Sequence, residues 1–484
     1  MGLAQPHTGN VLAIDQGTSA TKALVVSVAG EVLASAQVAV RPRYGSDGLV
    51  EQDPHELLES VVEAGAQALA QASEPVDGIG LANQGETVLA WKPDTGAPLT
   101  DAIVWQDRRA QSICTELGDA AEHLAALTGL TLDPYFAAPK MAWIRRNLTT
   151  EGVVTTTDAW LVHRLTGAFV TDASTASRTM LMDLDRVEWS DEALSLFGLA
   201  SERMPTIVDA AGEIGSTGRF GASADLPVTG LLVDQQAALL GEGCVTPGSA
   251  KCTFGTGAFL LANTGGEPRR STGGLVSCVA WRLDSIPTYC LDGQVYTVAS
   301  AVRWLTDIGI VGGAADLDRV GATVDGTGGV SFVPAFTGLA APWWRSDTRA
   351  AIAGLSLSTE RGHLVHALCE GVAAQVAALV AAAGADLGSP LTALKVDGGL
   401  TRSTLLMQTH ADLLQIPIEV FASPDATALG VAAAARQGLV GHSEPIPAVP
   451  DPAAVYWPAI GADEADERLD RHRRFIDALI EAQT

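Results

Sequence analysis

The sequence predicts an α/β protein built from two large domains. A chain of 484 residues is longer than one hydrophobic core usually supports, so two domains are the default expectation. Strand-like and helix-like segments follow one another along the chain, a pattern typical of α/β folds. Two glycine-threonine turns, at residues 17–18 and 255–257, each lie between strand-like segments. The pair of turns indicates a duplicated fold in which each half binds phosphate through its turn.

The stretch from Gly230 to Phe259 contains the residues from which we expect chemistry. Asp234 ends an apolar run, and the turn Gly255-Thr256-Gly257 follows about twenty residues later. An aspartate that faces a bound hydroxyl can take its proton. Backbone N–H groups of a glycine-rich turn can surround a phosphate. The spacing therefore predicts a base and a phosphate clamp close together.

The composition favours a cytoplasmic enzyme. The formal charge is −26, which argues against nucleic acid, because phosphate backbones demand clustered lysine and arginine. We expect no membrane span, since apolar runs are interrupted by polar residues or glycine turns, and MGLAQPHTGN does not resemble a signal peptide. The six cysteines lack C-x-x-C pairing and nearby histidines, so we expect reduced, mostly buried thiols and no zinc site.

The N-terminal segment predicts three strands, at Val11–Ile14, Thr21–Val28 and Glu31–Val40. The turn between the first two contains Thr18 and Ser19, and Lys22 lies just beyond. This turn differs from a Walker loop, because no G-K-[ST] begins a helix. It is either a phosphate turn or an ordinary hairpin turn. A carboxylate at Asp15, leaving a buried strand beside such amides, could hold Mg2+ through water.

A helix is expected to follow Asp53-Pro54-His55-Glu56, which combines an N-cap, a first-position proline and an acidic first turn. The apolar residues after it recur at helical spacing, so this helix packs one face on a sheet. A strand at Val76–Leu81 then runs into Asn83-Gln84-Gly85-Glu86-Thr87. Strand ends in α/β sheets border ligand crevices, so Glu86 either accepts hydrogen bonds from substrate hydroxyls or is a solvated turn residue.

The middle and C-terminal parts of the chain supply further elements. The aromatic turn at residues 132–136 either lines a polyol pocket or fills a domain edge. We expect a strand at Ser331–Phe336, a packed alanine-rich helix from Thr359 to about Ala385, a strand at Ile416–Phe421 and a closing helix from Thr427. Beyond Glu444, the prolines 445, 447, 450 and 452 and a charged helix over 463–482 predict a surface appendage.

Eleven segments, in the same order along residues 10 to 437, resemble the FGGY family of carbohydrate kinases, and within that family the glycerol kinases. They are AIDQGTSATK, GLANQGETVLAW, AIVWQDRRAQ, DPYFAAPKMAWI, TTDAWLVHRLTG, ASRTMLMDL, GLLVDQQAALLGEG, TFGTGAFLLANTG, FVPAFTGLAAPWW, VDGGLTRSTLLMQTHADLLQIPIE and ATALGVAAAA.

The resemblance implies two actin-like (ribonuclease H-like) ATPase domains that close on ATP, Mg2+ and a small polyol or sugar in an interdomain cleft. The N-terminal FGGY domain would span residues 10–243, the C-terminal one residues 244–445, and the appendage residues 446–484. It also leaves a homodimer or homotetramer open.

The resemblance further implies a role for each matching residue. Asp234 looks like the general base, and Asp15 and Asp234 like the metal ligands. Substrate would contact Gly85, Glu86, Tyr135, Asp234, Gln235 and Phe259. The nucleotide would contact Thr18, Ser19, Ala20, Lys22, Gly255, Thr256, Ala299, Arg303, Gly399 and Ser403.

The sequence departs from the glycerol kinases at several of these positions. Gly85 stands where they have an arginine, whose fixed donors bind adjacent hydroxyls. We therefore expect a larger and less polar pocket on that side, which suits a tetritol, tetrulose or pentulose, or else glycerol bound more weakly. On the nucleotide side, Ala299 replaces a glycine, Arg303 a glutamine and Ser403 an asparagine.

Two alternatives to a glycerol kinase remain. The alternative among enzymes is a kinase for a tetritol, tetrulose or pentulose, and within it a xylulose kinase is disfavoured, because those enzymes typically have Met-His near residue 85. A non-catalytic actin-like ATP clamp is the alternative from another class. The retained Asp234 argues against the clamp, because a clamp needs no base aimed at a hydroxyl.

Overall fold

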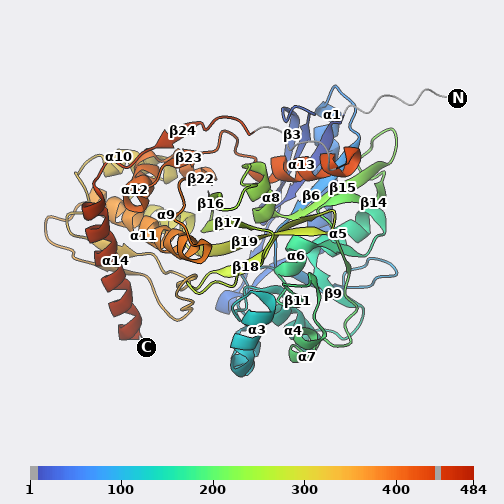
Figure 1. Ribbon diagram of the computed structural model, residues 1–484, viewed down its shortest axis with the longest axis horizontal. Helices are drawn as coiled ribbons and strands as arrows, with labels where there is room; N and C mark the ends of the chain where they lie inside the picture. Colours follow the sequence, from blue (N-terminus) through green and yellow to red (C-terminus); the bar gives the residue numbers. More distant parts are fainter. Residues whose placement is uncertain (1–8, 442–448, 484) are drawn as a thin grey trace.

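The computed structural model describes residues 9–441 and 449–483, and two mixed β-sheets, one in each half of the molecule, organise it (Figure 1). The first sheet has the order β14 (Ala211–Thr217), β15 (Leu226–Val233), β6 (Gly78–Asn83), β1 (Val11–Gln16), β2 (Ala20–Val26), β3 (Val32–Ala39). The second has the order β18 (Val276–Leu283), β19 (Ile286–Val295), β17 (Ala258–Gly265), β16 (Ala250–Phe254), β22 (Leu394–Asp397), β23 (Ile418–Val420), β24 (Ala454–Tyr456). The predicted α/β class with two sheets is confirmed.

The two sheets share a topology around their glycine-threonine turns. Strand β1 pairs antiparallel with β2 and parallel with β6. Strand β16 pairs antiparallel with β17 and parallel with β22 in the same way. The turn of the β1–β2 hairpin contains Gly17 and Thr18, and that of the β16–β17 hairpin contains Gly255 and Thr256. The predicted duplication is therefore present in the fold.

Helices cover both faces of the first sheet. Helix α1 (Pro54–Gln71) packs on β2 and β3, and its N-cap is Asp53, whose Oδ1 accepts a 2.8 Å hydrogen bond from the His55 N–H. The opposite face is covered by α8 (Asp234–Gly241) and α13 (Ala426–Val440). Figure 1 shows α13, late in the chain, lying over the strands of the N-terminal half. The fold thus brings the C-terminal segment back to the first sheet.

Helices α8 and α13 cross at two glycines. A Cβ atom at Gly430 would lie 1.7 Å from the Ala237 carbonyl oxygen, and one at Gly241 would lie 2.1 Å from the Ala426 carbonyl oxygen. Real Cβ atoms do not come so close to a backbone oxygen, so both positions require glycine. This close crossing holds the C-terminal half of α8 against the first turn of α13, and the Thr427 hydroxyl of α13 donates to the Asp234 carbonyl at 3.4 Å.

Smaller sheets and short helices complete the N-terminal half. The third sheet has the order β4 (Arg43–Tyr44), β5 (Val50–Gln52), β8 (Ala102–Ile103), β7 (Val88–Trp91), β9 (Val153–Thr156), and two strand pairs join β10 (Val170–Asp172) to β13 (Thr206–Val208) and β11 (Met182–Asp183) to β12 (Glu188–Trp189). The helices are α2 (Gln111–Glu116), α3 (Ala121–Thr128), α4 (Ala137–Asn147), α5 (Thr157–Thr166), α6 (Ala173–Ser177) and α7 (Asp191–Leu196).

The C-terminal half surrounds one long helix. Helix α11 (Arg361–Leu387) packs on β17 and β19, with α9 (Ala299–Asp307), α10 (Leu317–Gly321), α12 (Thr404–Leu414), α14 (Ala462–Gln483) and the pair β20 (Ser331–Val333) and β21 (Ala351–Ala353) around it. Within the described residues, α11 is the one helix long and apolar enough to cross a membrane, and 67% of its apolar window is buried inside the protein. It is a core helix, as predicted.

Several elements begin or end at other residues than the sequence predicts. The strand predicted at 331–336 ends at Val333, because Pro334 has no N–H to offer a neighbouring strand. The strand predicted at 416–421 is shorter, Ile418–Val420. Prolines 445 and 447 and the predicted boundary at 445–446 lie outside the described residues. The six cysteines are free and buried, as predicted.

Candidate active site

A cavity of about 160 Å3 lies between the two halves of the molecule. The junction of β15 with α8, the turn after β6, the β16–β17 hairpin and strand β19 form its walls. The lining residues are Thr18, Gly85, Glu86, Trp105, Tyr135, Arg178, Val233, Asp234, Gln235, Gln236, Thr253, Gly255, Thr256, Phe259 and Asp292. All six residues predicted to contact substrate are among them. That they touch substrate stays a prediction.

Asp234 is the first residue of α8, immediately after the last residue of β15. A helix N-terminus favours a carboxylate, and Oδ1 accepts a 2.7 Å hydrogen bond from the Gln235 N–H. Burial nevertheless raises the pKa of Asp234 to about 7, with the negative charge of Glu86 as the second cause. A general base works best when its pKa is near the operating pH. Asp234 is therefore suited to accept a proton at neutral pH.

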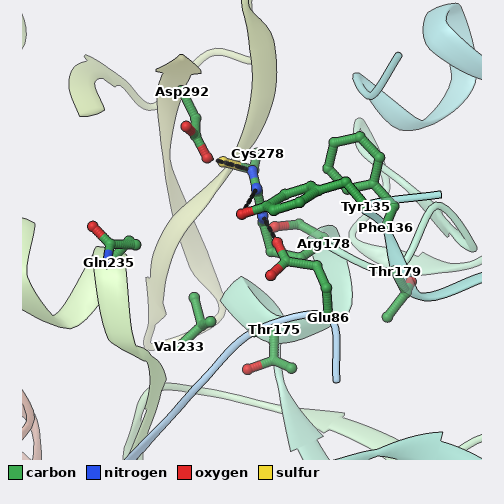
Figure 2. A network of polar contacts seen from close by, with 12 residues as sticks. Glu86, Tyr135, Phe136, Thr175, Arg178, Thr179, Val233, Gln235, Cys278 and Asp292 are labelled. Carbon is green, nitrogen blue, oxygen red and sulfur yellow. Dashed lines mark hydrogen bonds and ion pairs between the residues drawn. The ribbon is translucent and has the colours of Figure 1, made fainter. Parts of the chain in front are cut away.

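A buried arginine links two carboxylates on the cavity wall (Figure 2). Arg178 Nε lies 2.6 Å from Glu86 Oε1, and Arg178 Nη1 lies 2.5 Å from Asp292 Oδ2. The guanidinium also lies over the Tyr135 ring, 5.6 Å from its centroid. Burial raises the pKa of Glu86 and of Asp292, and the charge of Arg178 opposes the rise in both.

This network leaves more negative than positive groups on the cavity wall. Arg178 directs Nε and Nη1 at Glu86 and Asp292, whereas Asp292 Oδ1 is buried without a hydrogen-bond partner. The lining contains three carboxylates, those of Glu86, Asp234 and Asp292, and one guanidinium. Hydroxyl groups can donate to such acceptors. A substrate that carried its own carboxylate or phosphate would instead be repelled.

Aromatic rings form the other wall of the cavity. The Trp105 ring meets Tyr135 edge to face with centroids 5.7 Å apart, and it meets Phe259 at 6.0 Å. Trp105 Nε1 donates a 2.9 Å hydrogen bond to Thr18 Oγ1 in the first phosphate turn. Within the aromatic turn at 132–136, Tyr135 thus lines the pocket, whereas Phe136 is buried in the core. The ring contacts also connect this wall to both hairpins.

Gln235 is held in place by a buried lysine. Lys251, in β16, donates through Nζ to Gln235 Oε1 at 2.5 Å and to Thr253 Oγ1 at 2.8 Å. The Lys251 side chain is fully buried, so its charge is not screened by bulk water. Since Oε1 faces Lys251, the amide orientation of Gln235 is determined by the second sheet.

The first hairpin gathers charges next to Asp234. The pKa of Asp15 is raised to about 7. Burial is the largest cause, and the negative charges of Asp234 and Asp425 add to it, whereas the positive charge of Lys22 opposes the rise. Lys22 Nζ forms an ion pair with Asp425 Oδ1 at the N-terminus of α13. The predicted phosphate ligand Lys22 and the predicted metal ligand Asp15 therefore lie in one cluster. Among the residues that the structure describes, no group of three or more His, Cys, Asp or Glu side chains could hold a metal by itself.

The second hairpin is joined to the start of α9. The Gly255 N–H donates to the Gly257 carbonyl at 2.9 Å, and the Ala299 N–H donates to the Gly255 carbonyl at 3.3 Å. Arg303 is exposed one turn further along α9. Ala299 and the Gly255 turn are thus adjacent, and Arg303 can reach solvent near them.

The last two predicted nucleotide contacts follow β22. Gly399 begins a short 3-10 helix, Gly399–Arg402, after Gly398, whose φ of 97° suits glycine. Ser403 is the N-cap of α12, and its hydroxyl donates to Asp318 Oδ1 at 2.6 Å. That hydroxyl is therefore used within the protein. Adenosine binding by these two residues, and nucleotide contact by Ser19 and Ala20 at the first hairpin, stay predictions.

Several cavity residues were not predicted from the sequence. Trp105, Arg178, Val233 and Asp292 line the cavity. Arg178 had a visible signal, a lone charge within the run ASTASRTM. Asp292 had a similar signal, a lone carboxylate in the strand IPTYCLDGQV. Val233 had none, because it looks like an ordinary residue of a buried strand until the fold places it beside Gly85.

Comparison with known proteins agrees with this architecture. The sequence profile of the FGGY family of carbohydrate kinases, N-terminal domain, matches residues 10–241, and that of the C-terminal domain matches residues 250–437. A glycerol kinase from Thermus brockianus is 43% identical over 437 residues, 87% of this chain and 88% of that protein.

Two solved structures share the whole architecture. A Plasmodium falciparum glycerol kinase with ADP has a TM-score of 0.89 and 30% identity, covering 97% of this chain and 98% of that chain. A xylulose kinase from Brucella ovis has a TM-score of 0.87 and 28% identity, covering 97% and 99%. The same two-domain architecture thus occurs in kinases named for different substrates.

Proposed function

Because the chain belongs to the FGGY family of carbohydrate kinases, we propose that it transfers the terminal phosphoryl group of ATP to a terminal hydroxyl of glycerol or a similar neutral polyol, with Asp234 as the general base. The chain is a glycerol kinase-like, ATP-dependent phosphotransferase that acts on a polyol or sugar. The observation that supports the finer proposal is the cavity that brings Asp234 together with Glu86, Tyr135 and both glycine-threonine hairpins.

The proposed reaction begins with a hydroxyl that donates to Asp234. The carboxylate takes the hydroxyl proton as the oxygen attacks the terminal phosphorus, and the bond from that phosphorus to the bridging oxygen breaks, so that ADP leaves. Glu86 and Gln235 would orient the remaining hydroxyls, and the aromatic rings of Trp105 and Phe259 would exclude water from the reacting groups. Positioning of this kind supplies much of the rate enhancement in phosphoryl transfer.

The hairpins suit a nucleotide and a magnesium ion. Burial and, after it, the negative charge of Asp234 raise the pKa of Asp15, and a divalent cation would relieve the repulsion between the two carboxylates. Magnesium usually keeps several waters and binds through one or two carboxylates plus phosphates, which fits a site with few protein ligands. Bound Mg2+ would neutralise charge on the transferred group, and Lys22 and the Gly255 turn would hold phosphates.

Two other functions remain as alternatives. A tetritol, tetrulose or pentulose is favoured as substrate if glycerol proves poor, because residue 85 supplies no guanidinium. A non-catalytic ATP clamp has no specific observation in its favour. The cytoplasmic location and the homodimeric or homotetrameric assembly also stay predictions, which cell fractionation and sedimentation would test.

The test is a coupled ADP-release assay with Mg-ATP against glycerol, dihydroxyacetone, tetritols, tetruloses, pentitols and pentuloses. Strong turnover of glycerol is the expected result. Preference for a four- or five-carbon substrate would move the assignment to the alternative enzyme, and no turnover with any of these substrates would favour the clamp.

A further inference from the structure

Gly85 and Val233 meet at the wall of the cavity. A Cβ atom built on Gly85 would lie 2.9 Å from Val233 Cγ2, closer than real Cβ atoms come to a neighbour. Gly85 is not among the residues with positive φ, whereas the next residue, Glu86, has a φ of 56°. The backbone at residue 85 therefore allows a side chain, and the γ-methyl of Val233 is what excludes one.

Val233 has little freedom to move away. Its backbone N–H donates to Ser174 Oγ at 3.1 Å, and it pairs with Asn83 in the parallel register of β15 and β6. Its side chain is buried, and a β-branched residue has few alternative rotamers. Asp234 follows directly, so any shift of the Val233 backbone would also move the proposed base.

This contact corrects one expectation from the sequence. Gly85 was expected to leave a larger pocket on its side, but the space next to its Cα is filled by a methyl group. The expected loss of polarity is consistent with the structure, since a methyl group neither donates nor accepts. The cavity is thus apolar at Val233 and rich in acceptors at Glu86 and Asp292.

We propose that Gly85 and Val233 act as one specificity-determining pair, in which Val233 takes the place of a side chain at residue 85. The inference rests on the proposed kinase function. The substrate class is a neutral polyol that turns a C–H face to Val233 and its hydroxyls to Glu86 and Asp292. A hydroxyl facing the Val233 methyl would lose its hydrogen bonds to water, which corresponds to roughly ten- to hundredfold in kcat/KM.

A double-mutant cycle with small substitutions tests the pair. Gly85→Ala should lower kcat/KM for the best polyol at least fivefold, because the new Cβ displaces Val233 and Asp234. Val233→Ala should relieve the contact, so that G85A/V233A recovers to within about twofold of V233A alone. Such non-additivity is expected of residues in contact. If G85A is as active as the wild type, or if the two effects simply add, the proposal is overturned.

A second cycle tests the chemistry of the wall. We compare glycerol with propane-1,2-diol and propane-1,3-diol in the wild type, G85R, V233G and G85R/V233G. G85R should be impaired with every substrate, whereas G85R/V233G should regain activity. The double variant should also raise the ratio of kcat/KM for glycerol to kcat/KM for the diols at least tenfold, because the guanidinium can then donate a hydrogen bond to the additional hydroxyl of glycerol. An unchanged ratio in an active double variant would refute the proposal.

Two measurements distinguish a variant that is misfolded or cannot bind nucleotide from one whose polyol site alone is altered. Melting temperatures and calorimetric titration with ADP report whether each variant is folded and binds nucleotide. If G85A does not fold, V233A alone must still raise KM for glycerol and improve the relative use of larger polyols, and no change in either would count against the pair. A wild type that is inactive with every polyol contradicts the proposed function itself, whereas an active wild type with an additive cycle contradicts only this inference.

Discussion

Arg178 donates through Nε to the Glu86 carboxylate over 2.6 Å, although the two residues are 92 positions apart in the chain. Both side chains are about 5% exposed or less. A buried ion pair contributes little net stability by itself, but removal of one partner leaves an uncompensated charge. The relationship therefore makes Arg178 important both for folding and for the orientation of Glu86.

We expect Arg178→Met to lower the free energy of unfolding by about 3–5 kcal/mol, because Glu86 and Asp292 both lose their cation. The midpoint of urea denaturation, with its slope, measures the change. Arg186→Met is the control, since the Arg186 side chain is 77% exposed and its loss should change little. Equal effects of the two substitutions would contradict the assigned role of Arg178.

Asp234→Asn should reduce phosphoryl transfer by a factor of roughly 10²–10⁴, the usual contribution of a general base, and leave ATP binding largely intact. Single-turnover ADP release and calorimetric titration with ATP measure the two quantities. Asp119→Asn makes the same chemical change at an exposed position and should retain full activity. Substantial turnover by the Asp234 variant would remove that residue from the role of base.

The pH profile should show the ionisation of Asp234. A base works only when deprotonated, so kcat/KM should fall as the pH drops below about 7, the raised pKa of Asp234. Because Glu86 is the second cause of that rise, Glu86→Gln should move the acid limb of the profile to lower pH, even though it also weakens substrate contact. An acid limb near pH 4 in the wild type would show that Asp234 titrates as an ordinary aspartate.

Glu370 should hold the C-terminal helix on the core. Its carboxylate lies 3.0 Å from Arg468 Nη1 and 3.2 Å from Arg471 Nη2 of α14, while Ile476 and Leu479 of α14 pack on the segment around Val333. Glu370→Gln should lower the free energy of unfolding by roughly 1–3 kcal/mol, as measured by urea denaturation. Glu467→Gln, at an exposed position of α14, is the matched control.

The same contact has a defined pH dependence. Burial raises the pKa of Glu370, but the nearby His472 ring, 3.7 Å away, and the charges of Arg468 and Arg471 outweigh that effect, so the folded pKa lies below the ordinary 4.5. A depressed carboxyl pKa stabilises the fold above the unfolded value and loses that contribution as the pH falls from about 4.5 through the folded value. The difference between wild type and E370Q should therefore shrink under acid conditions and be constant near pH 7.

The two halves should close on their ligands. The cavity is lined from both halves, so joint binding of polyol and nucleotide should draw them together and exclude water. Small-angle scattering should report a smaller radius of gyration with both ligands than with either one. No compaction with both bound would argue against closure.

Much of the fold could be read from local patterns. The Asp53-Pro54 start of α1, the apolar periodicity of α11 and the two glycine-threonine turns each correspond to a physical preference that acts within a few residues. The limits of the strands were less predictable, as at Val333, because strand length depends on a partner elsewhere in the chain. The packing of α13 on the first sheet had no local signal at all.

The sequence by itself determined the α/β class, the duplicated hairpins and the placement of Asp234 at the end of a buried strand, because strands, turns and caps depend on neighbouring residues. Only the tertiary structure decided that Arg178 joins Glu86 to Asp292, that Asp425 pairs with Lys22 and that Val233 fills the space beside Gly85. These contacts join residues far apart in the chain, and they depend on how the strands and helices pack, which no short stretch of sequence specifies.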